Sequence, residues 1–205
     1  LKIKNQLNEK NLVLQVGHSE RFHEVWDKKE YYSSYLQSPC SVKISRFAPF
    51  KGRATDVDVV QDLMIHDLDL LNMLLNDDPE EITSIGFKSL TSNWDHVETL
   101  LKFKNGNQSS IIVGRNSVTE VRQVEITNKK GTLLIDLLNT EISRIEKKEV
   151  IKTKYNKRDH LYLEQEEFYL SIINKTQPRV DCEAGVAAVR LVNKVLESLE
   201  LSGEL

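Results

Sequence analysis

Two carboxylates and one imidazole stand at helical spacing in the most regular apolar stretch of the chain, Val59–Leu75. Asp62, His66 and Asp69 occupy positions i, i+4 and i+7, which places them on one stripe of a helix. An imidazole titrates near working pH, and a carboxylate one turn away can orient it or support its charged form. The spacing therefore indicates an acid–base pair of His66 and Asp62, although a solvated helix edge fits the pattern about equally well.

A metal site is the third interpretation of this stripe. A single helix would provide two carboxylates and one histidine, so the remaining ligands would have to come from elsewhere, and we expect no metal site. The loop before the helix carries Lys51 and Arg53, and Arg46 lies in the stretch before that loop. Three converging cations would suit a phosphate-bearing substrate, whereas an ordinary solvated basic loop explains them without any ligand.

The elements that must position these residues follow from hydrophobic periodicity. Residues 2–10 and 12–16 indicate a helix and a buried strand, and residues 20–36 an aromatic-rich helix. Helical spacing returns near the C-terminus, around 162–173 and over 182–200. Alternating apolar residues and hairpin-type turns predict an antiparallel meander between the two helical parts. Its strands are 82–90, 97–104, 109–115, 121–128, 132–138 and 141–146, with an earlier strand at 40–47.

The fold class that this order predicts is α+β, with an open, mainly antiparallel sheet and helices on one face. The helices can cover one face of the sheet, so the other face is solvated or pairs with another subunit.

The composition excludes several classes of protein. Of 205 residues, 40% are apolar and 29% charged, which is typical of a globular chain. The 28 basic and 31 acidic residues leave a net charge of −3, so we expect no nucleic-acid partner. No apolar run reaches the roughly 18–20 residues of a membrane span. The distant Cys40 and Cys182 are typical of reduced thiols, and with no signal peptide pattern we expect a cytoplasmic protein.

Motifs that bind nucleotides or form nucleophiles are also absent from the sequence. Glycine occurs 8 times, and neither G-x-G-x-x-G nor G-x-x-x-x-G-K-[ST] is present, so the sequence has no turn of the type that cradles the phosphates of a dinucleotide. It has no serine-centred nucleophile elbow and no C-x-x-C pair.

Four segments resemble the C-terminal domain of the Gfo/Idh/MocA oxidoreductases, in the same order and over nearly the whole chain. They are 17–22 (GHSERF), 52–69 (GRATDVDVVQDLMIHDLD), 162–168 (YLEQEEF) and 182–185 (CEAG). The Asp-x-x-x-His motif at Asp62 and His66 is the most specific of these matches. The resemblance implies that residues 18–205 form the α+β substrate and oligomerisation domain, and that residues 1–17 are the last helix and strand of a Rossmann cofactor domain. The glycine motif and catalytic lysine of that family are missing here, so we expect a fragment that is inactive alone.

The same resemblance implies an NAD- or NADP-dependent dehydrogenase that oxidises a hydroxyl of a sugar or polyol. His66 would be the catalytic acid/base, Asp62 would position His66 or the substrate, and Arg21 would lie near the cofactor, which the missing domain mainly binds. This version of the motif is similar to the branch that oxidises nucleotide-linked amino sugars such as UDP-N-acetylglucosamine at C3. We expect a homodimer or homotetramer through the open sheet. The candidate substrate contacts are Arg53, Tyr162 and Asp69.

Two other functions compete with this prediction. A non-catalytic assembly or binding module would not need Asp62 and His66, but the missing lysine favours it. An NAD-dependent glycosidase of the same family would cleave a glycosidic bond by transient oxidation and would form no net NADH.

Overall fold

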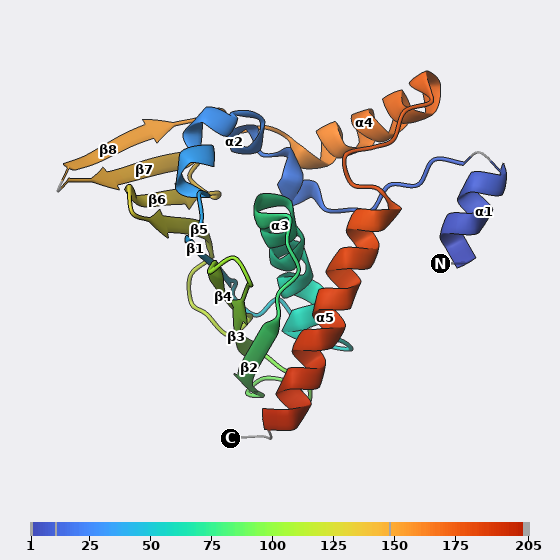
Figure 1. Cartoon of the computed structure of the whole chain (residues 1–205). Coiled ribbons are helices and arrows are strands. Elements are labelled where there is room, and N and C mark those ends of the chain that lie inside the picture. The colour runs from blue at the N-terminus through green and yellow to red at the C-terminus, as the bar shows by residue number, and fades with distance from the viewer. Residues whose placement is uncertain (1, 11, 148, 203–205) are drawn as a thin grey trace.

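An eight-stranded sheet forms the centre of the protein in the computed structural model, which describes residues 2–10, 12–147 and 149–202. Its strand order is β2-β3-β4-β1-β5-β6-β7-β8, and all neighbours are antiparallel except the parallel pair β1 and β4. Helices lie against one face of this sheet (Figure 1). The predicted α+β class is thus confirmed. The strands are β1 Ser41–Phe47, β2 Glu81–Phe87, β3 His96–Lys102, β4 Gln108–Gly114, β5 Val121–Asn128, β6 Gly131–Asp136, β7 Glu141–Glu146 and β8 Glu149–Lys154.

The predicted meander needs two corrections. The first strand in the chain, β1, lies between β4 and β5, so it joins two antiparallel groups into one sheet. The eighth strand, β8, was not predicted because nearly all of its side chains are exposed and carry no apolar alternation. β8 lies at the edge of the sheet and pairs with β7.

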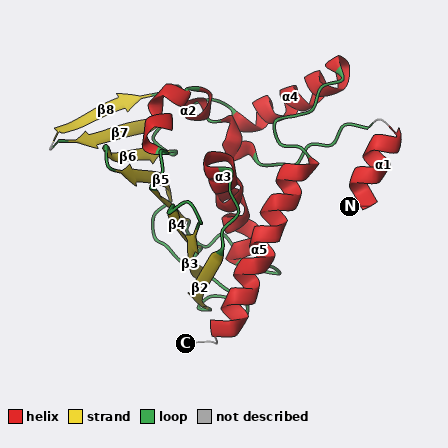
Figure 2. Ribbon diagram, viewed as in Figure 1, coloured by secondary structure: helices red, strands yellow, loops and turns green. Residues whose placement is uncertain are grey.

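Two helices cover the inner face of the sheet and hold the candidate site. Helix α3 (Ile65–Leu75) follows a single π-type turn, η4 (Val60–Met64), and packs against α5 (Cys182–Ser202), which runs along β2 (Figure 2). Met64 and Leu68 of this stretch are fully buried. Burying a side chain of this size contributes about 1.5–3 kcal/mol, so these contacts fix the position of α3 on the sheet.

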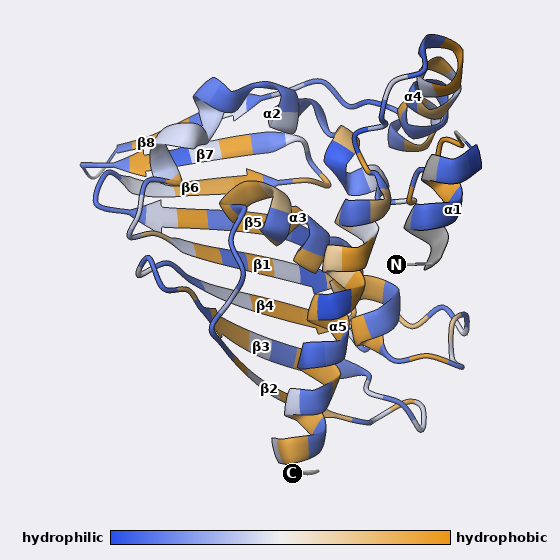
Figure 3. Ribbon diagram, turned by 45° about the vertical axis from the view of Figure 1, so that its right-hand side comes forward, coloured by the Kyte–Doolittle hydropathy of each residue, from blue (hydrophilic) through white to orange (hydrophobic). Residues whose placement is uncertain are grey.

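Alternation along the strands builds the core under these helices. Val42 and Ile44 of β1 and Val124 and Ile126 of β5 are at most 2% exposed, while the residues between them face the other side. Figure 3 shows the resulting apolar bands along the strands beneath α3 and α5. The third inward position of β1 is Arg46, a charged residue in an apolar row.

The N-terminal part departs from the prediction. Residues 12–16 form no strand and are tied to the rest by the Val16 N–H, which donates to the Val180 carbonyl at 2.9 Å. A short apolar run is compatible with several buried conformations, so periodicity alone could not separate them. Helix α1 (Lys2–Lys10) precedes this segment, as predicted.

The predicted helix over residues 20–36 is also wrong. Trp26, Tyr32 and Tyr35 are all buried in the same core, and a single straight helix could not turn all three inward. The Trp26 indole donates to the Glu20 carbonyl, and the Tyr32 hydroxyl donates to the Trp26 carbonyl, which fixes the turns between them. The short elements are η1 Ser19–Phe22, α2 Glu24–Asp27, η2 Lys29–Tyr31 and η3 Ser33–Tyr35.

Helix α4 (His160–Asn174) projects away from the sheet (Figure 1). Asp159 caps it, because its side chain accepts a hydrogen bond from the Tyr162 N–H at 3.0 Å. Among the described residues, no helix is long and apolar enough to cross a membrane. Both cysteines, Cys40 and Cys182, are free.

Candidate functional site

His66 lies in the first turn of α3 and is partly exposed. Its Nδ1 is 3.2 Å from Nδ1 of His18, and its Nε2 has no hydrogen-bond partner among the described residues. Burial, followed by the charge of Arg46, lowers the pKa of His66 to about 4. The imidazole is therefore neutral near pH 7 and can accept a proton.

The other half of the predicted pair, Asp62, lies in the π-type turn. The Ile65 N–H reaches back five residues to the Val60 carbonyl, so this turn holds more residues than an α-turn and shifts Asp62 off the line of His66. No contact within the described part of the chain joins the Asp62 carboxylate to His66. The pairing of the two residues stays a prediction. Asp58, one turn earlier, caps the helix by accepting from the Val60 and Gln61 N–H groups.

A small pocket of about 50 Å³ opens beside Asp62. Lys51 and Arg53 from the loop after β1 line it, and both are exposed. Neither forms an ion pair with another described residue. A pocket of this size holds a few water-sized groups, so a larger ligand would extend beyond it. The carboxylates of Asp62 and Glu120 line the same pocket, so its lining carries both signs of charge.

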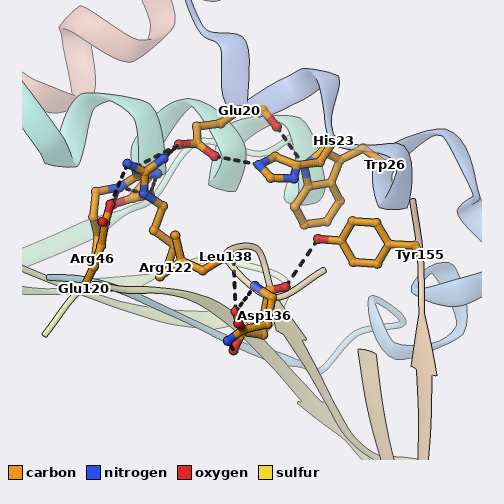
Figure 4. A network of polar contacts seen from close by, with 11 residues as sticks. Glu20, His23, Trp26, Arg46, Glu120, Arg122, Asp136, Leu138 and Tyr155 are labelled. Atoms are coloured by element: carbon orange, nitrogen blue, oxygen red, sulfur yellow. Dashed lines mark hydrogen bonds and ion pairs between the residues drawn. The ribbon is translucent and has the colours of Figure 1, made fainter. Parts of the chain in front are cut away.

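Two arginines from neighbouring strands form the wall of this pocket. Arg46 of β1 and Arg122 of β5 are direct partners in the sheet register, an arrangement in which like charges repel. Glu20 removes this repulsion: its Oε1 accepts from Nη1 of Arg46 and Nη1 of Arg122, each at 2.9 Å (Figure 4). Asp67 holds the other side of Arg46 through contacts of 2.7–3.0 Å.

The electrostatics of Glu20 follow from these partners. Burial alone would raise its pKa, but the hydrogen bond from His23 and the charges of Arg46 and Arg122 outweigh burial and hold the pKa well below its usual range. Glu20 is therefore a carboxylate throughout the working pH range. Of the three cations in the sequence pattern, Arg46 is paired with Glu20 and Asp67. The ligand contacts of Lys51 and Arg53 stay predictions.

Arg21 and Asp69, predicted as a cofactor contact and a substrate contact, bind each other. The Arg21 Nε and Nη2 atoms donate to the two Asp69 oxygens, both at 2.7 Å. Arg21 is 8% exposed and Asp69 is 1% exposed. Nothing in this geometry tests their predicted ligand contacts, which stay predictions.

Tyr162 lies on the solvent side of α4 and is 57% exposed. Its hydroxyl donates to Glu166 on the same helix at 2.9 Å. No described contact brings it to α3 or to the pocket, so its role as a substrate contact stays a prediction.

Three residues of the site were not predicted: His18, Glu20 and Arg122. His18 and Glu20 belong to the 17–22 segment, and the signal was their position directly after a buried apolar run. Along β5, Arg122 is on the same face as Val124 and Ile126, which point into the core. A charged residue at an inward strand position indicates a buried partner.

The described residues do not fit a dinucleotide site. The sequence lacks the glycine-rich phosphate turn, and the guanidinium of Arg21 is directed at Asp69. In the same part of the chain, no three His, Cys, Asp or Glu side chains are arranged to hold a metal ion.

The open sheet with α3 and α5 on one face matches the folds of dehydrogenases and oxidoreductases of known structure. UDP-N-acetylglucosamine 3-dehydrogenase from Acidithiobacillus ferrooxidans superposes with a TM-score of 0.88 at 26% identity, covering 98% of this chain and 66% of that one. A putative NADPH-dependent oxidoreductase from Desulfitobacterium hafniense shares the fold with a TM-score of 0.81 at 19% identity, over 96% of this chain and 65% of that one. An oxidoreductase from Agrobacterium radiobacter, solved with NAD+ and L-tartaric acid, shares it with a TM-score of 0.82 at 15% identity, over 98% and 67%.

A family model matches the sequence as well. It is the model of the GFO/IDH/MocA C-terminal domain, and residues 41–134 match it. A curated UDP-N-acetylglucosamine 3-dehydrogenase from Acidithiobacillus ferrooxidans is 30% identical over 139 residues, which are 65% of this chain and 42% of that protein. The chain thus spans less than half of the curated relative and about two thirds of its solved relatives.

Proposed function

We propose that this chain is the substrate-binding and proton-transfer part of an NAD(P)-dependent dehydrogenase that oxidises a hydroxyl of a sugar. The observation that carries the proposal is the state of His66: neutral near pH 7, partly exposed, held at Nδ1 and without a partner at Nε2. A histidine in this state can accept the proton of a substrate hydroxyl.

In the proposed reaction, the substrate O–H bond breaks and a new N–H bond forms at His66 Nε2. The nicotinamide would accept the hydride that leaves the carbon bearing this hydroxyl, so that the alcohol becomes a carbonyl. Because the described residues do not form a dinucleotide site, a cofactor-binding domain outside them would have to supply the nicotinamide. That domain would end with residues 1–17, and it would join the rest of the chain near Val16, whose N–H donates to the Val180 carbonyl.

A nucleotide-linked amino sugar is the substrate that we favour. Lys51 and Arg53 line the pocket next to Asp62 and have no carboxylate partner among the described residues, as a diphosphate site requires. The curated relative at 30% identity is named as acting on UDP-N-acetylglucosamine. The pocket holds about 50 Å³, so the phosphates would fill it while the sugar lies outside it.

The open face of the sheet is the proposed contact between copies of the chain. By register, Ile85, Leu100, Ile145 and Val150 lie on the face away from α3, and they are between 40% and 57% exposed. Apolar side chains spread over an uncovered sheet favour burial against a second copy, as a homodimer or homotetramer.

The test measures NADH or NADPH formation with UDP-N-acetylglucosamine, using protein expressed from the whole gene with any residues that precede Leu1. His66→Asn should lower kcat by about 10²–10⁴-fold, the usual contribution of a positioned acid/base. His96→Asn is the matched control, because His96 stacks on Phe87 on the opposite face of the sheet and should keep full activity. Unchanged turnover in His66→Asn would overturn the assigned role.

Binding by the chain itself is a second measurement. Calorimetry of the 205-residue chain should detect UDP-N-acetylglucosamine and should not detect NAD. If neither the chain nor the whole protein binds the sugar nucleotide, UDP-N-acetylglucosamine is excluded as the substrate. Release of a leaving group without net NADH would support the glycosidase instead, and a whole protein with neither activity would support an assembly module.

A further inference from the structure

The two histidines of the site meet through the same ring atom. His18 and His66 place their Nδ1 atoms 3.2 Å apart, with ring planes at 86° to each other. His18 is 3% exposed and lies between the 12–16 segment and η1, whereas His66 is on α3. The contact therefore joins two separate parts of the chain beside the proposed base.

A hydrogen bond between two Nδ1 atoms allows two arrangements of protons. If His18 donates, neutral His66 carries its proton on Nε2 and cannot accept another there. If His66 donates, its proton is on Nδ1 and its Nε2 presents a lone pair. The direction of this single hydrogen bond thus decides whether His66 can work as a base at Nε2.

Asp69 favours one of these directions. Its Oδ1 is 3.9 Å from Nε2 of His18, a buried nitrogen without a hydrogen-bond partner in the described part of the chain. At this distance the carboxylate acts through its charge, and it favours the His18 tautomer that carries a proton on Nε2. That tautomer leaves the Nδ1 of His18 as an acceptor for the Nδ1–H of His66.

The position of Asp69 is itself fixed. Arg21 holds both Asp69 oxygens at 2.7 Å, and both residues are buried, so the carboxylate cannot rotate away from His18. Arg21 and Asp69 come from η1 and α3, the same two parts of the chain that carry His18 and His66.

We propose that His18 is a positioning residue that, oriented by Asp69, holds His66 in the Nδ1–H tautomer and so leaves Nε2 free to take the substrate proton. This inference rests on the proposed function for the identity of the base. It assigns to Asp69 a contact with His18 in addition to its ion pair with Arg21.

The proton balance is simple. When His66 accepts a proton at Nε2, its Nδ1–H continues to donate to His18, and His18 stays neutral. Arg46 of β1, Arg122 of β5 and a charged His18 oppose the imidazolium of His66, and Glu20 of η1 favours it. Burial lowers the pKa of His18 and so favours its neutral form, and a neutral acceptor supports the charged form of His66 without another net charge.

The first measurement is the tautomer of His66, read from the ¹⁵N shifts of its imidazole ring in the 205-residue chain at pH 7.5. We expect the Nδ1–H form in the unsubstituted chain. Observation of the Nε2–H form there overturns the proposal, whatever the behaviour of any variant.

Two variants separate this role from simple packing. His18→Asn keeps an acceptor oxygen near the position of Nδ1, so His66 should stay in the Nδ1–H form. His18→Phe keeps the ring shape but has no acceptor, so His66 should shift toward the Nε2–H form. A structural role predicts the opposite order, with phenylalanine the better replacement, and that order would overturn the proposal.

Kinetics of the whole protein give a second readout. His18→Phe should lower kcat by about 10–100-fold with KM nearly unchanged, as for other residues that orient a catalytic ligand, and His18→Asn should recover most of the loss. Correct tautomers in a protein without dehydrogenase activity would contradict the proposed function and leave the histidine pair intact. Activity with the Nε2–H tautomer would contradict the histidine pair alone.

Discussion

Glu20 is the residue that permits two arginines to stand side by side in the sheet. Replacement by glutamine keeps the shape and removes the charge that Arg46 and Arg122 share. Arg46 keeps Asp67 and Arg122 keeps Glu120, so the loss is that of the charge between the two guanidinium groups. We expect Glu20→Gln to lower the free energy of unfolding by about 1.5–3 kcal/mol, the usual contribution of a hydrogen bond to a charged group. Urea denaturation at pH 7 measures the change.

Glu120→Gln is the matched control for this prediction. Glu120 contacts the same Arg122 at 3.1 Å, but its side chain is 36% exposed. An exposed pair contributes less than about 1 kcal/mol, so this variant should unfold almost like the unsubstituted chain. Equal losses in the two variants would show that Glu20 has no special role in holding the arginines.

At the same scale, the sequence predicted His66 and Asp62 as candidates but not the side chains that contact His66. The spacing of Asp62, His66 and Asp69 assumed a regular α-helix, and the π-type turn shifts Asp62 out of that register. The contacts of His66 with His18, and of Arg46 with Glu20, cross long stretches of chain, and spacing along one helix carries no information about them. These contacts become visible only in the folded structure.

The β5–β6 hairpin is an element that depends on one glycine. Gly131 has φ of 147°, and a Cβ built there would lie 2.3 Å from the Ile145 carbonyl oxygen of β7. Since both the backbone conformation and the space exclude a side chain, Gly131→Ala should lower the free energy of unfolding by about 2–3 kcal/mol. The measurement is again urea denaturation, with unchanged midpoint as the contradicting result.

Gly52→Ala is the control variant, because it tests the cost of a positive φ without a steric clash. Gly52 has φ of 65° and no atom within 4 Å of a built Cβ, so its replacement should cost about 1 kcal/mol. The difference between the two glycine variants then reports the close approach of β6 and β7.

Most of the elements could be predicted, and the failures share a cause. Strong alternation located β1 and the strands from β2 to β7, and helical spacing located α3, α4 and α5. The prediction for residues 20–36 was wrong because their buried aromatic side chains follow the tertiary core rather than a local period. The prediction for residues 12–16 was wrong because a short apolar run does not distinguish a strand from an irregular, partly exposed segment. The place of β1 inside the sheet is a non-local pairing that no pattern within one strand encodes.

For the whole molecule, three histidines make the stability depend on pH. The pKa of His66 and that of His160 are each lowered to about 4, and the pKa of His18 is lowered as well, in each case mainly by burial. Between pH 6.5 and 4 the unfolded chain binds more protons than the folded one, so the free energy of unfolding should fall as the pH falls through this window and change little above it. In His66→Asn this fall should be shallower when unfolding midpoints are compared at pH 7 and 4.5. An unchanged fall would contradict the lowered pKa.

The open face sets the behaviour of the whole molecule in solution. Leu100 lies on β3, next to the edge strand β2, and is 52% exposed, with Thr83 and Ser110 as its neighbours on the adjacent strands. If two copies bury this face against each other, Leu100→Lys places a charge in the contact, because a buried unpaired ammonium is strongly unfavourable. Light scattering should then find a multiple of 23.6 kDa for the unsubstituted chain and 23.6 kDa for the variant. Val118→Lys, at a position that is 93% exposed in a loop away from the strands, should keep the larger mass. A single mass of 23.6 kDa for all three proteins would show that this face stays solvated in the isolated chain.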